Sequence, residues 1–270
     1  MKNFFKIDRL ILGLILLAGL FFRLYGLNWD SGFHLHPDER MLVMVTEKIS
    51  LPENFSSAFT PESSLNPKFF AYGSFPIYLL KLTSNIATYL LRDPLLSTYA
   101  SINLVGRILS VLFDIGTIIL IFRLGRKIFS SATGLLASAF YAFCVFPIQL
   151  SHFFAVDTFL TFFIVLTLYR LIIFYEKPSL KNASVSGVSF GFALATKVSA
   201  TVIIISVGTA VAIDLILIIG KRIRLLLKHK KIFYSSEKKI TILKNKLAAL
   251  PRFILANCKY LAVMAFITAI

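Results

Sequence analysis

Long apolar runs recur along the chain, and they restrict the fold more than any other feature of the sequence. A helix that crosses a membrane needs about 20 mainly apolar residues, because the hydrocarbon core is about 30 Å thick. Several runs of this kind are present, and hydrophobic residues make up 57% of the 270 positions. Soluble domains contain roughly 45–50% apolar residues. The sequence therefore predicts an all-α, polytopic membrane helical bundle with about seven membrane segments.

Charged residues indicate which way these segments run. Lys2, Lys6 and Arg9 precede the first apolar run, and basic residues favour the cytoplasmic side of a membrane. The run has no small-x-small cleavage site, so we interpret it as an uncleaved signal anchor in the plasma membrane with a cytoplasmic N-terminus. The formal net charge of +16 then reflects cytoplasmic loops rather than nucleic-acid binding. Cys144 and Cys258 lie within apolar runs and suggest neither a disulfide framework nor a zinc site.

One membrane domain is predicted over residues 1–270. Its parts are a first span at 10–27, an outer loop with an interfacial helix at 28–101, spans two to six at 102–220, a basic cytoplasmic loop at 221–252 and the start of a seventh span at 253–270. The basic loop holds eleven Lys and Arg residues and one acid, which suits the anionic lipids of the inner leaflet. The last run ends without a polar cap, so we expect this chain to be the N-terminal part of a longer protein.

The apolar run at residues 75–91 contains polar side chains, and composition alone does not decide whether it spans the membrane. If it did, Arg123, Arg126 and Lys127 would lie outside, together with the basic block near residue 230. An interfacial helix instead places both basic sets in the cytoplasm. The positive-inside rule favours this second topology.

The remaining segments follow from that topology. They are a span at 102–122, an inner turn at 123–127, a span at 133–150, an outer turn at 151–156, a span from Asp157 to near Tyr175, and a hairpin at 183–220 that turns near Lys197. The first arm of the hairpin carries small residues every four positions, at Ala183, Gly187, Gly191, Ala195 and Ser199. Such a stripe allows close packing against another membrane helix.

This topology brings many ionisable residues to the outer face. They are His34, His36, Asp38, Glu39 and Lys68 in the first loop, Arg107 about one turn inside the second span, His152 and Asp157 at the second outer turn, and Lys197 at the hairpin tip. Pro37 followed by two acids is typical of a helix start. Cations can hold a leaving phosphate while a carboxylate takes a proton from an acceptor, so the set suits transfer from a phosphorylated lipid.

At these residues the chain resembles the GT-C glycosyltransferases, specifically the protein O-mannosyltransferase and aminoarabinose-transferase branch (glycosyltransferase family 39-like), which uses polyprenyl-phosphate sugars. The stretches that carry the resemblance are His36-Pro-Asp-Glu-Arg40, Asn66-Pro-Lys-Phe-Phe-Ala-Tyr-Gly-Ser-Phe-Pro-Ile-Tyr78, Gly106-Arg-Ile-Leu-Ser110 with Leu124-Gly-Arg-Lys-Ile-Phe129, Ser151-His-Phe-Phe-Ala-Val-Asp-Thr-Phe-Leu-Thr-Phe162, and Gly191-Phe-Ala-Leu-Ala-Thr-Lys197. Each motif is weak alone, and their order and topology make the resemblance specific.

The resemblance implies an inverting membrane glycosyltransferase that moves a sugar from a polyprenyl-phosphate carrier to a protein or lipid-glycan acceptor on the non-cytoplasmic face. It implies a first-loop acid as catalytic base, which corresponds to Asp38 with Glu39 beside it, and a second acid at Asp157. The candidate substrate-binding residues are Lys68, Tyr72, Arg107, Lys197, His36 and His152. A divalent cation such as Mg²⁺ or Mn²⁺, held by Asp38 and Asp157, is compatible with the sequence but not required by it.

Several of these residues also have structural interpretations that the sequence leaves open. Asp38 and Glu39 could serve only to stabilise a helix N-terminus. Asp157 could be an N-cap, and Lys197 could extend its amine to the interface from the hairpin tip.

Two other functions also remain open. A transporter or flippase of lipid-linked substrates would carry charges through the bundle as a relay, and Asp114, Arg170 and Asp214 do fall within spans. Ionisable residues in spans are functional candidates by default, and Asp114 and Arg170 could pair or line the bundle interior. A truncated, non-catalytic membrane subunit is the other alternative.

Overall fold

The computed structural model of the chain describes residues 2–52, 54–206, 208 and 220, with side chains from residue 7 onward. Across that part of the chain the regular structure is entirely helical. The α-helices are α1 (Lys2–Leu24), α2 (Pro37–Glu47), α3 (Phe75–Leu91), α4 (Ile102–Ile128), α5 (Ser131–Phe143), α6 (Val145–Ser151), α7 (Val156–Glu176) and α8 (Leu180–Thr196), with 3₁₀ turns η1 (Ser56–Phe59), η2 (Pro94–Ser97) and η3 (Val198–Thr201). The predicted all-α class is confirmed.

Among the described residues, two helices, α4 and α7, are long and apolar enough to cross a membrane, and the bent pair α5 and α6 makes a third if the two helices form one span. The structure is therefore a helical membrane bundle. The basic loop at 221–252, the seventh span at 253–270 and Asp214 lie outside the described residues, as does most of the second arm of the hairpin.

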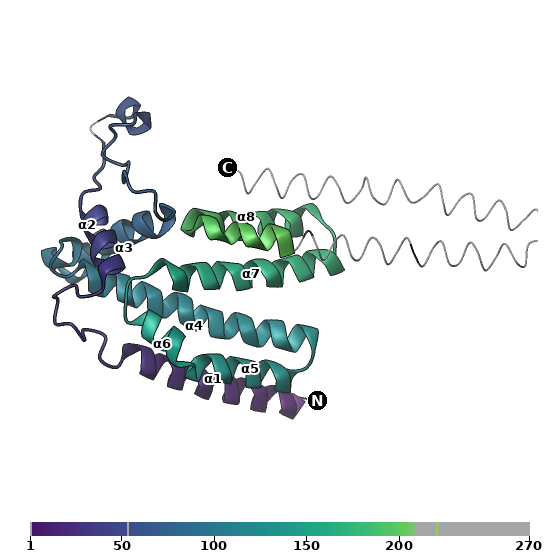
Figure 1. The fold of residues 1–270 in the computed structure, drawn as a ribbon. Helices are drawn as coiled ribbons and strands as arrows, with labels where there is room; N and C mark the ends of the chain where they lie inside the picture. The colour runs from purple at the N-terminus through teal and green to yellow at the C-terminus, as the bar shows by residue number, and fades with distance from the viewer. Residues whose placement is uncertain (1, 53, 207, 209–219, 221–270) are drawn as a thin grey trace, which may run out of the picture.

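The long helices lie side by side and share two ends (Figure 1). The loop between α1 and α4, the connection from α6 to α7 and the C-terminus of α8 all lie at one end, which we name the loop end. The N-terminus and the α4–α5 and α7–α8 connections lie at the other end. Because α1 ends and α4 begins at the loop end, the chain between them returns to the side it left. The helix predicted in that chain is present as α3, with the predicted bounds. Its position at the membrane interface stays a prediction.

The helix predicted at 133–150 is wrong as a single element. It is broken at Cys144, whose φ of −68° and ψ of 128° are extended, and α5 and α6 meet at 58°. Pro147 explains the break, because a proline ring clashes with the carbonyl of the residue four positions earlier. That residue is Phe143, the last of α5.

The inner turn predicted at 123–127 is also wrong, since α4 continues to Ile128. Basic residues in a last helical turn interact favourably with the helix dipole, and Arg126 and Lys127 occupy that turn. The chain then reverses sharply. A Cβ atom on Gly125 would lie 2.8 Å from the Cα of Gly134, so these two glycines allow α4 and α5 to approach at backbone distance.

The stripe of small residues on α8 is only partly a packing face. Ala183 and Gly187 are buried, whereas Ala195 and Ser199 are exposed. The helix ends at Thr196, and Lys197 follows in extended conformation. The predicted break near Lys197 is thus present in the structure.

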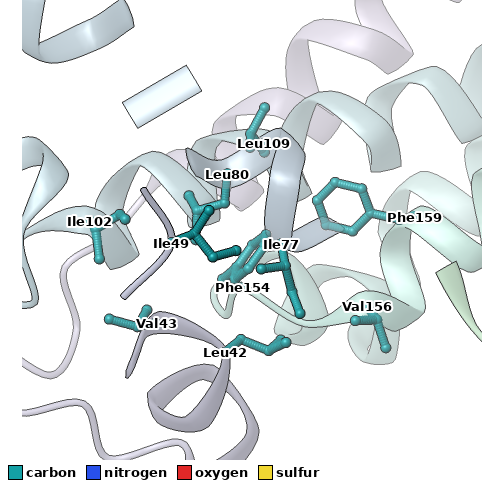
Figure 2. Packing of buried hydrophobic residues seen from close by; sticks show 10 residues of the cluster. All are labelled: Leu42, Val43, Ile49, Ile77, Leu80, Ile102, Leu109, Phe154, Val156 and Phe159. Atoms are coloured by element: carbon teal, nitrogen blue, oxygen red, sulfur yellow. The ribbon is translucent and has the colours of Figure 1, made fainter. Parts of the chain in front are cut away.

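A buried apolar cluster fixes the first-loop helices to the bundle at the loop end (Figure 2). It joins α2 and α3 to α4 and to the start of α7, and its fully buried members include Leu42, Val43, Ile77, Leu80, Phe154 and Phe159. Burying one side chain of this size contributes about 1.5–3 kcal/mol. The residues that precede and follow these anchors are consequently held in defined positions above the bundle.

Candidate functional site

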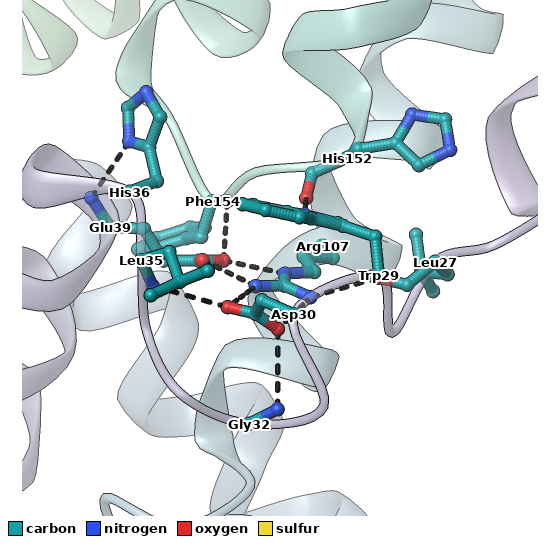
Figure 3. A network of polar contacts seen from close by, with 10 residues as sticks. All are labelled: Leu27, Trp29, Asp30, Gly32, Leu35, His36, Glu39, Arg107, His152 and Phe154. Carbon is teal, nitrogen blue, oxygen red and sulfur yellow. Dashed lines mark hydrogen bonds and ion pairs between the residues drawn. The ribbon is translucent and has the colours of Figure 1, made fainter.

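Arg107 lies at the centre of a buried polar network at the loop end (Figure 3). Its Nε and Nη2 atoms donate to Glu39 at 2.8 and 2.6 Å, and Nη1 and Nη2 donate to Asp30 at 3.0 and 2.8 Å. A further bond from Nη1 reaches the carbonyl of Leu27 at 2.9 Å. A guanidinium has five N–H groups, so every donor of Arg107 is used.

Asp30 is a buried member of this network that the sequence did not distinguish from other loop acids. Its carboxylate also accepts the backbone N–H groups of Gly32 and Leu35, both at 3.3 Å. Burial raises the pKa of Asp30, but the hydrogen bonds and charge of Arg107 outweigh it, so the net pKa lies below the ordinary value of 3.8. Asp30 is therefore ionised at neutral pH.

Glu39 connects the network to a second loop. It is fully buried, and besides Arg107 it accepts the backbone N–H of Phe154 at 2.9 Å. Neither Glu39 nor Arg107 exposes surface on which a substrate could bind. Their contacts join α2, α4 and the turn that leads into α7, so both residues position other groups.

Asp38, the residue before Glu39, faces away from the network and is exposed. It lies beside Tyr72, in the segment that leads to α3. Burial is the largest cause that raises the pKa of the Tyr72 phenol above its ordinary value of 10.0, and the charge and hydrogen bonding of Asp38 raise it further, while Lys197 opposes them. The tyrosine therefore keeps its proton at neutral pH.

Asp157 and Lys197 complete this group. The Lys197 Nζ lies 2.9 Å from Asp157 Oδ1 and 5.3 Å from the centroid of the Tyr72 ring. Both side chains are partly exposed, Lys197 at 30% and Asp157 at 42%. The alternative of Asp157 as an N-cap is wrong, because the N-cap of α7 is Ala155.

A backbone contact explains why Tyr72 meets Lys197. The N–H of Gly73 donates to the carbonyl of Thr196 at 2.9 Å. A Cβ atom on Gly73 would lie 1.9 Å from the carbonyl oxygen of Ala195, so only glycine fits at this crossing. The structure thus brings together Asp38, Tyr72, Asp157 and Lys197 from four parts of the chain, and we name these four residues the acid–lysine cluster.

Three histidines, His34, His36 and His152, form contacts within the loops around the acid–lysine cluster. His36 caps α2, with its Nδ1 accepting the N–H of Glu39 at 3.4 Å, and its ring stacks on Phe153 at 4.1 Å. His152 places its two ring nitrogens 2.8 and 2.9 Å from the carbonyl oxygens of Ile148 and Tyr25. His34 is buried against Tyr99, with ring centroids 4.2 Å apart. Each of the three has a structural role.

Lys68 is not drawn into the acid–lysine cluster. It is exposed, with a φ of 49°, and among the described residues no ion pair with it is found. No group of three or more His, Cys, Asp or Glu side chains suited to a metal ion occurs within the described ranges. The two carboxylates that could contribute to such a site, Asp38 and Asp157, both lie close to Tyr72.

A second buried polar group lies within the bundle, and the sequence did not reveal its composition. Asp114 pairs with Arg23 of α1, not with Arg170. The hydroxyls of Tyr141 and Ser151 also donate to Asp114, and Arg23 donates to the carbonyls of Gly19 and Ala142. This group ties α1 to α4, α5 and α6.

The fold and the site together define a helical membrane protein with a polar, charged cluster at one end of its bundle. The sequence profile of dolichyl-phosphate-mannose-protein mannosyltransferases matches residues 96–237, which is more than half of the chain. The chain belongs to this family, and it is a membrane glycosyltransferase that uses a lipid-linked sugar donor. No curated protein and no solved structure matches the chain.

Only two of the four residues of the acid–lysine cluster lie within the part of the chain that the family profile matches. Asp157 and Lys197 lie within the matched residues, as do Arg107 and His152, whereas Asp38 and Tyr72 precede them. The geometry connects the two halves, because Tyr72 lies next to Lys197 and Asp38 lies next to Tyr72.

Proposed function

We propose that this glycosyltransferase transfers a sugar from a polyprenyl-phosphate carrier, with inversion, to an acceptor on the non-cytoplasmic face of the plasma membrane. The observation that supports this most is the acid–lysine cluster, in which an exposed carboxylate, a protonated tyrosine and a lysine converge at the loop end. The opposite end carries Arg123, Arg126 and Lys177, and the positive-inside rule assigns such a surface to the cytoplasm.

In this proposal Asp38 is the catalytic base. It is exposed and forms no ion pair with another described residue. Besides its hydrogen bond with Tyr72, the carboxylate has lone pairs left to accept the proton of an acceptor hydroxyl. The acceptor oxygen forms a bond to the anomeric carbon while the bond from that carbon to the phosphate oxygen breaks. The proton passes to Asp38, and the polyprenyl phosphate leaves with the bonding electron pair. A single displacement of this kind inverts the anomeric configuration.

Lys197 and Tyr72 stabilise the leaving phosphate. Lys197 supplies a positive charge that Asp157 orients through their 2.9 Å contact. Tyr72 supplies a hydroxyl donor that its raised pKa keeps protonated. Preorganised donors aimed at developing charge are the main source of such stabilisation. Lys68, an exposed lysine of the same segment as Tyr72, would approach the phosphate from solvent.

Asp38 and Asp157 are the two residues of the cluster that would hold a divalent ion if the reaction uses one. Mg²⁺ is commonly held by one or two carboxylates together with substrate phosphates, and Asp38 and Asp157 would supply the carboxylates. Such an ion would neutralise charge on the leaving phosphate.

The proposal is tested with the full-length protein in lipid bilayers and a polyprenyl-phosphate sugar donor. Asp38→Asn should abolish most turnover, while Glu62→Gln, an exposed carboxylate of the same loop, should leave it unchanged. Undiminished turnover by Asp38→Asn would exclude Asp38 as the base. Nuclear magnetic resonance of the product should show the anomer opposite to that of the donor.

The orientation is tested separately by cysteine labelling of intact cells with a membrane-impermeant maleimide. Glu62→Cys should react from outside, and Lys177→Cys, at the opposite end, should react only after permeabilisation. The reverse pattern would contradict the proposed face.

A further inference from the structure

An arm formed by residues 50–66 projects from the loop between α2 and α3 (Figure 1). Its base is closed by two contacts, because Ser50 N–H donates to the carbonyl of Ser64 at 3.3 Å and Ser64 Oγ donates to the carbonyl of Ser50 at 3.0 Å. Further along, the Nδ2 of Asn66 donates to the carbonyl of Pro61 at 3.0 Å. These hydrogen bonds hold the two sides of the arm together at its base.

The tip of the arm presents two phenylalanines to its surroundings. Phe55 and Phe59 are 82% and 77% exposed, and their rings meet edge to face with centroids 5.1 Å apart. Asn54 holds the turn that carries them, since its Oδ1 accepts from Ser56 Oγ at 2.8 Å and from Ser57 N–H at 3.0 Å. Leu51, in the segment that enters the arm from α2, is 87% exposed. Adjacent large apolar side chains exposed together mark an interaction surface.

The direction of the arm determines what this surface meets. The arm reaches sideways across the bundle axis rather than along it, so its tip lies at about the level of α2 and α3 along that axis (Figure 1). At that level the bundle helices end, and α3 itself exposes Tyr89, Leu90 and Leu91 at 83%, 69% and 71%. Membrane-spanning helices end near the lipid headgroups.

We propose that Phe55 and Phe59 insert into the headgroup boundary of the leaflet at the loop end, and that the arm thereby anchors the first loop to the lipid surface. Interfacial segments bury Phe, Trp and Leu side chains at the boundary between headgroups and acyl chains. The arm contains no Lys or Arg between Ser50 and Asn66, whereas it contains Glu53 and Glu62. Attraction to anionic lipid therefore plays no part, and the insertion depends on apolar burial alone. The arm leads directly into Lys68 and Tyr72, so anchoring its tip sets the height of these residues above the membrane.

Spin labels on single cysteines test the insertion in the full-length protein, with Cys144 and Cys258 replaced by alanine. The protein is placed in phosphatidylcholine nanodiscs, and the label at Phe59→Cys is compared with a matched label at Glu62→Cys on the same arm. Power saturation should show the label at 59 more accessible to oxygen than to a water-soluble nickel complex. The label at 62 should show the opposite preference.

Three outcomes would overturn the proposal. If the nickel complex reaches residue 59 as readily as residue 62, the tip lies in water. If residue 59 is protected from both oxygen and nickel, protein covers the tip and the surface binds a polypeptide instead. Replacing roughly one third of the lipid with phosphatidylglycerol should leave the accessibility at 59 unchanged, and an insertion that occurs only with the anionic lipid would also contradict the proposal.

Discussion

The guanidinium of Arg107 binds both carboxylate oxygens of Glu39, with Nε–Oε1 and Nη2–Oε2 distances of 2.8 and 2.6 Å. Glu39 directly follows Asp38 in the first turn of α2. The buried pair therefore determines how that turn is oriented, with Glu39 facing the bundle and Asp38 facing outward. Both acids were predicted as catalytic residues, and the structure supports different roles for them.

Glu39→Gln should lower kcat by up to about 100-fold, because a misplacement of roughly 1 Å costs that much in an oriented site. The donor KM should change little, since Glu39 has no exposed surface. Steady-state kinetics combined with thermal unfolding distinguish the two acids. Glu39→Gln should lower both kcat and the Tm, whereas Asp38→Asn should lower kcat alone. A Glu39→Gln variant with normal kcat would refute the positioning role.

Arg107→Met should destabilise the protein by about 3–5 kcal/mol, since it leaves two buried carboxylates without a counter-charge. Denaturation in detergent micelles measures this loss. Arg126→Met is the matched control, because Arg126 is an exposed arginine of the same helix, and its effect should stay within about 0.5 kcal/mol. Equal stability of the two variants would contradict the network described here.

Asp30 should make the stability depend on pH in the acid range. Its pKa in the folded protein lies below the ordinary value of 3.8, so the folded state binds this proton less readily than the unfolded state does. The stabilisation is complete above pH 3.8 and is lost as the pH falls through the lower folded value. Unfolding measured against pH should show a shallower acid dependence in Asp30→Asn than in the parent protein.

The pair of Lys197 and Asp157 should matter for catalysis much more than for stability. Both side chains are partly exposed, and such ion pairs contribute about 0–1 kcal/mol. Lys197→Met should therefore lower kcat strongly while the Tm changes little. Because Asp157 acts through Lys197, the double variant with Asp157→Asn should be no worse than Lys197→Met alone. Additive losses in this double-mutant cycle would show that the two residues act independently.

Local features of the structure were predictable from the sequence. Proline followed by two acids marked the start of α2, and the charge of distant loops placed α3 at one end of the bundle. The motif order indicated the family, which the profile match confirms. Pro147 also indicated a helix break near Cys144, but one continuous helix was predicted there.

Long-range partners were not predictable in the same way. Arg107 lies 77 residues after Asp30 and 68 residues after Glu39 in the sequence. The apolar periodicity of a span does not indicate which acid its arginine will bind. The sequence left open whether Asp114 and Arg170 pair or line the bundle interior, and in the structure Asp114 pairs with Arg23. A pairing of this kind depends on how helices are arranged around one another, which only tertiary packing determines.

The crossing of Gly73 with the C-terminus of α8 has a consequence for engineering and for natural variation. Because the backbones of the two segments touch at residues 73 and 196, we expect that the loop between α1 and α4 and helix α8 cannot be exchanged independently between homologous enzymes. A chimera that combines the loop of one relative with the α8 region of another needs glycine at this position. Without it, Tyr72 and Lys197 would be displaced from one another. The requirement at Gly73 is thus a compatibility rule for recombining these proteins.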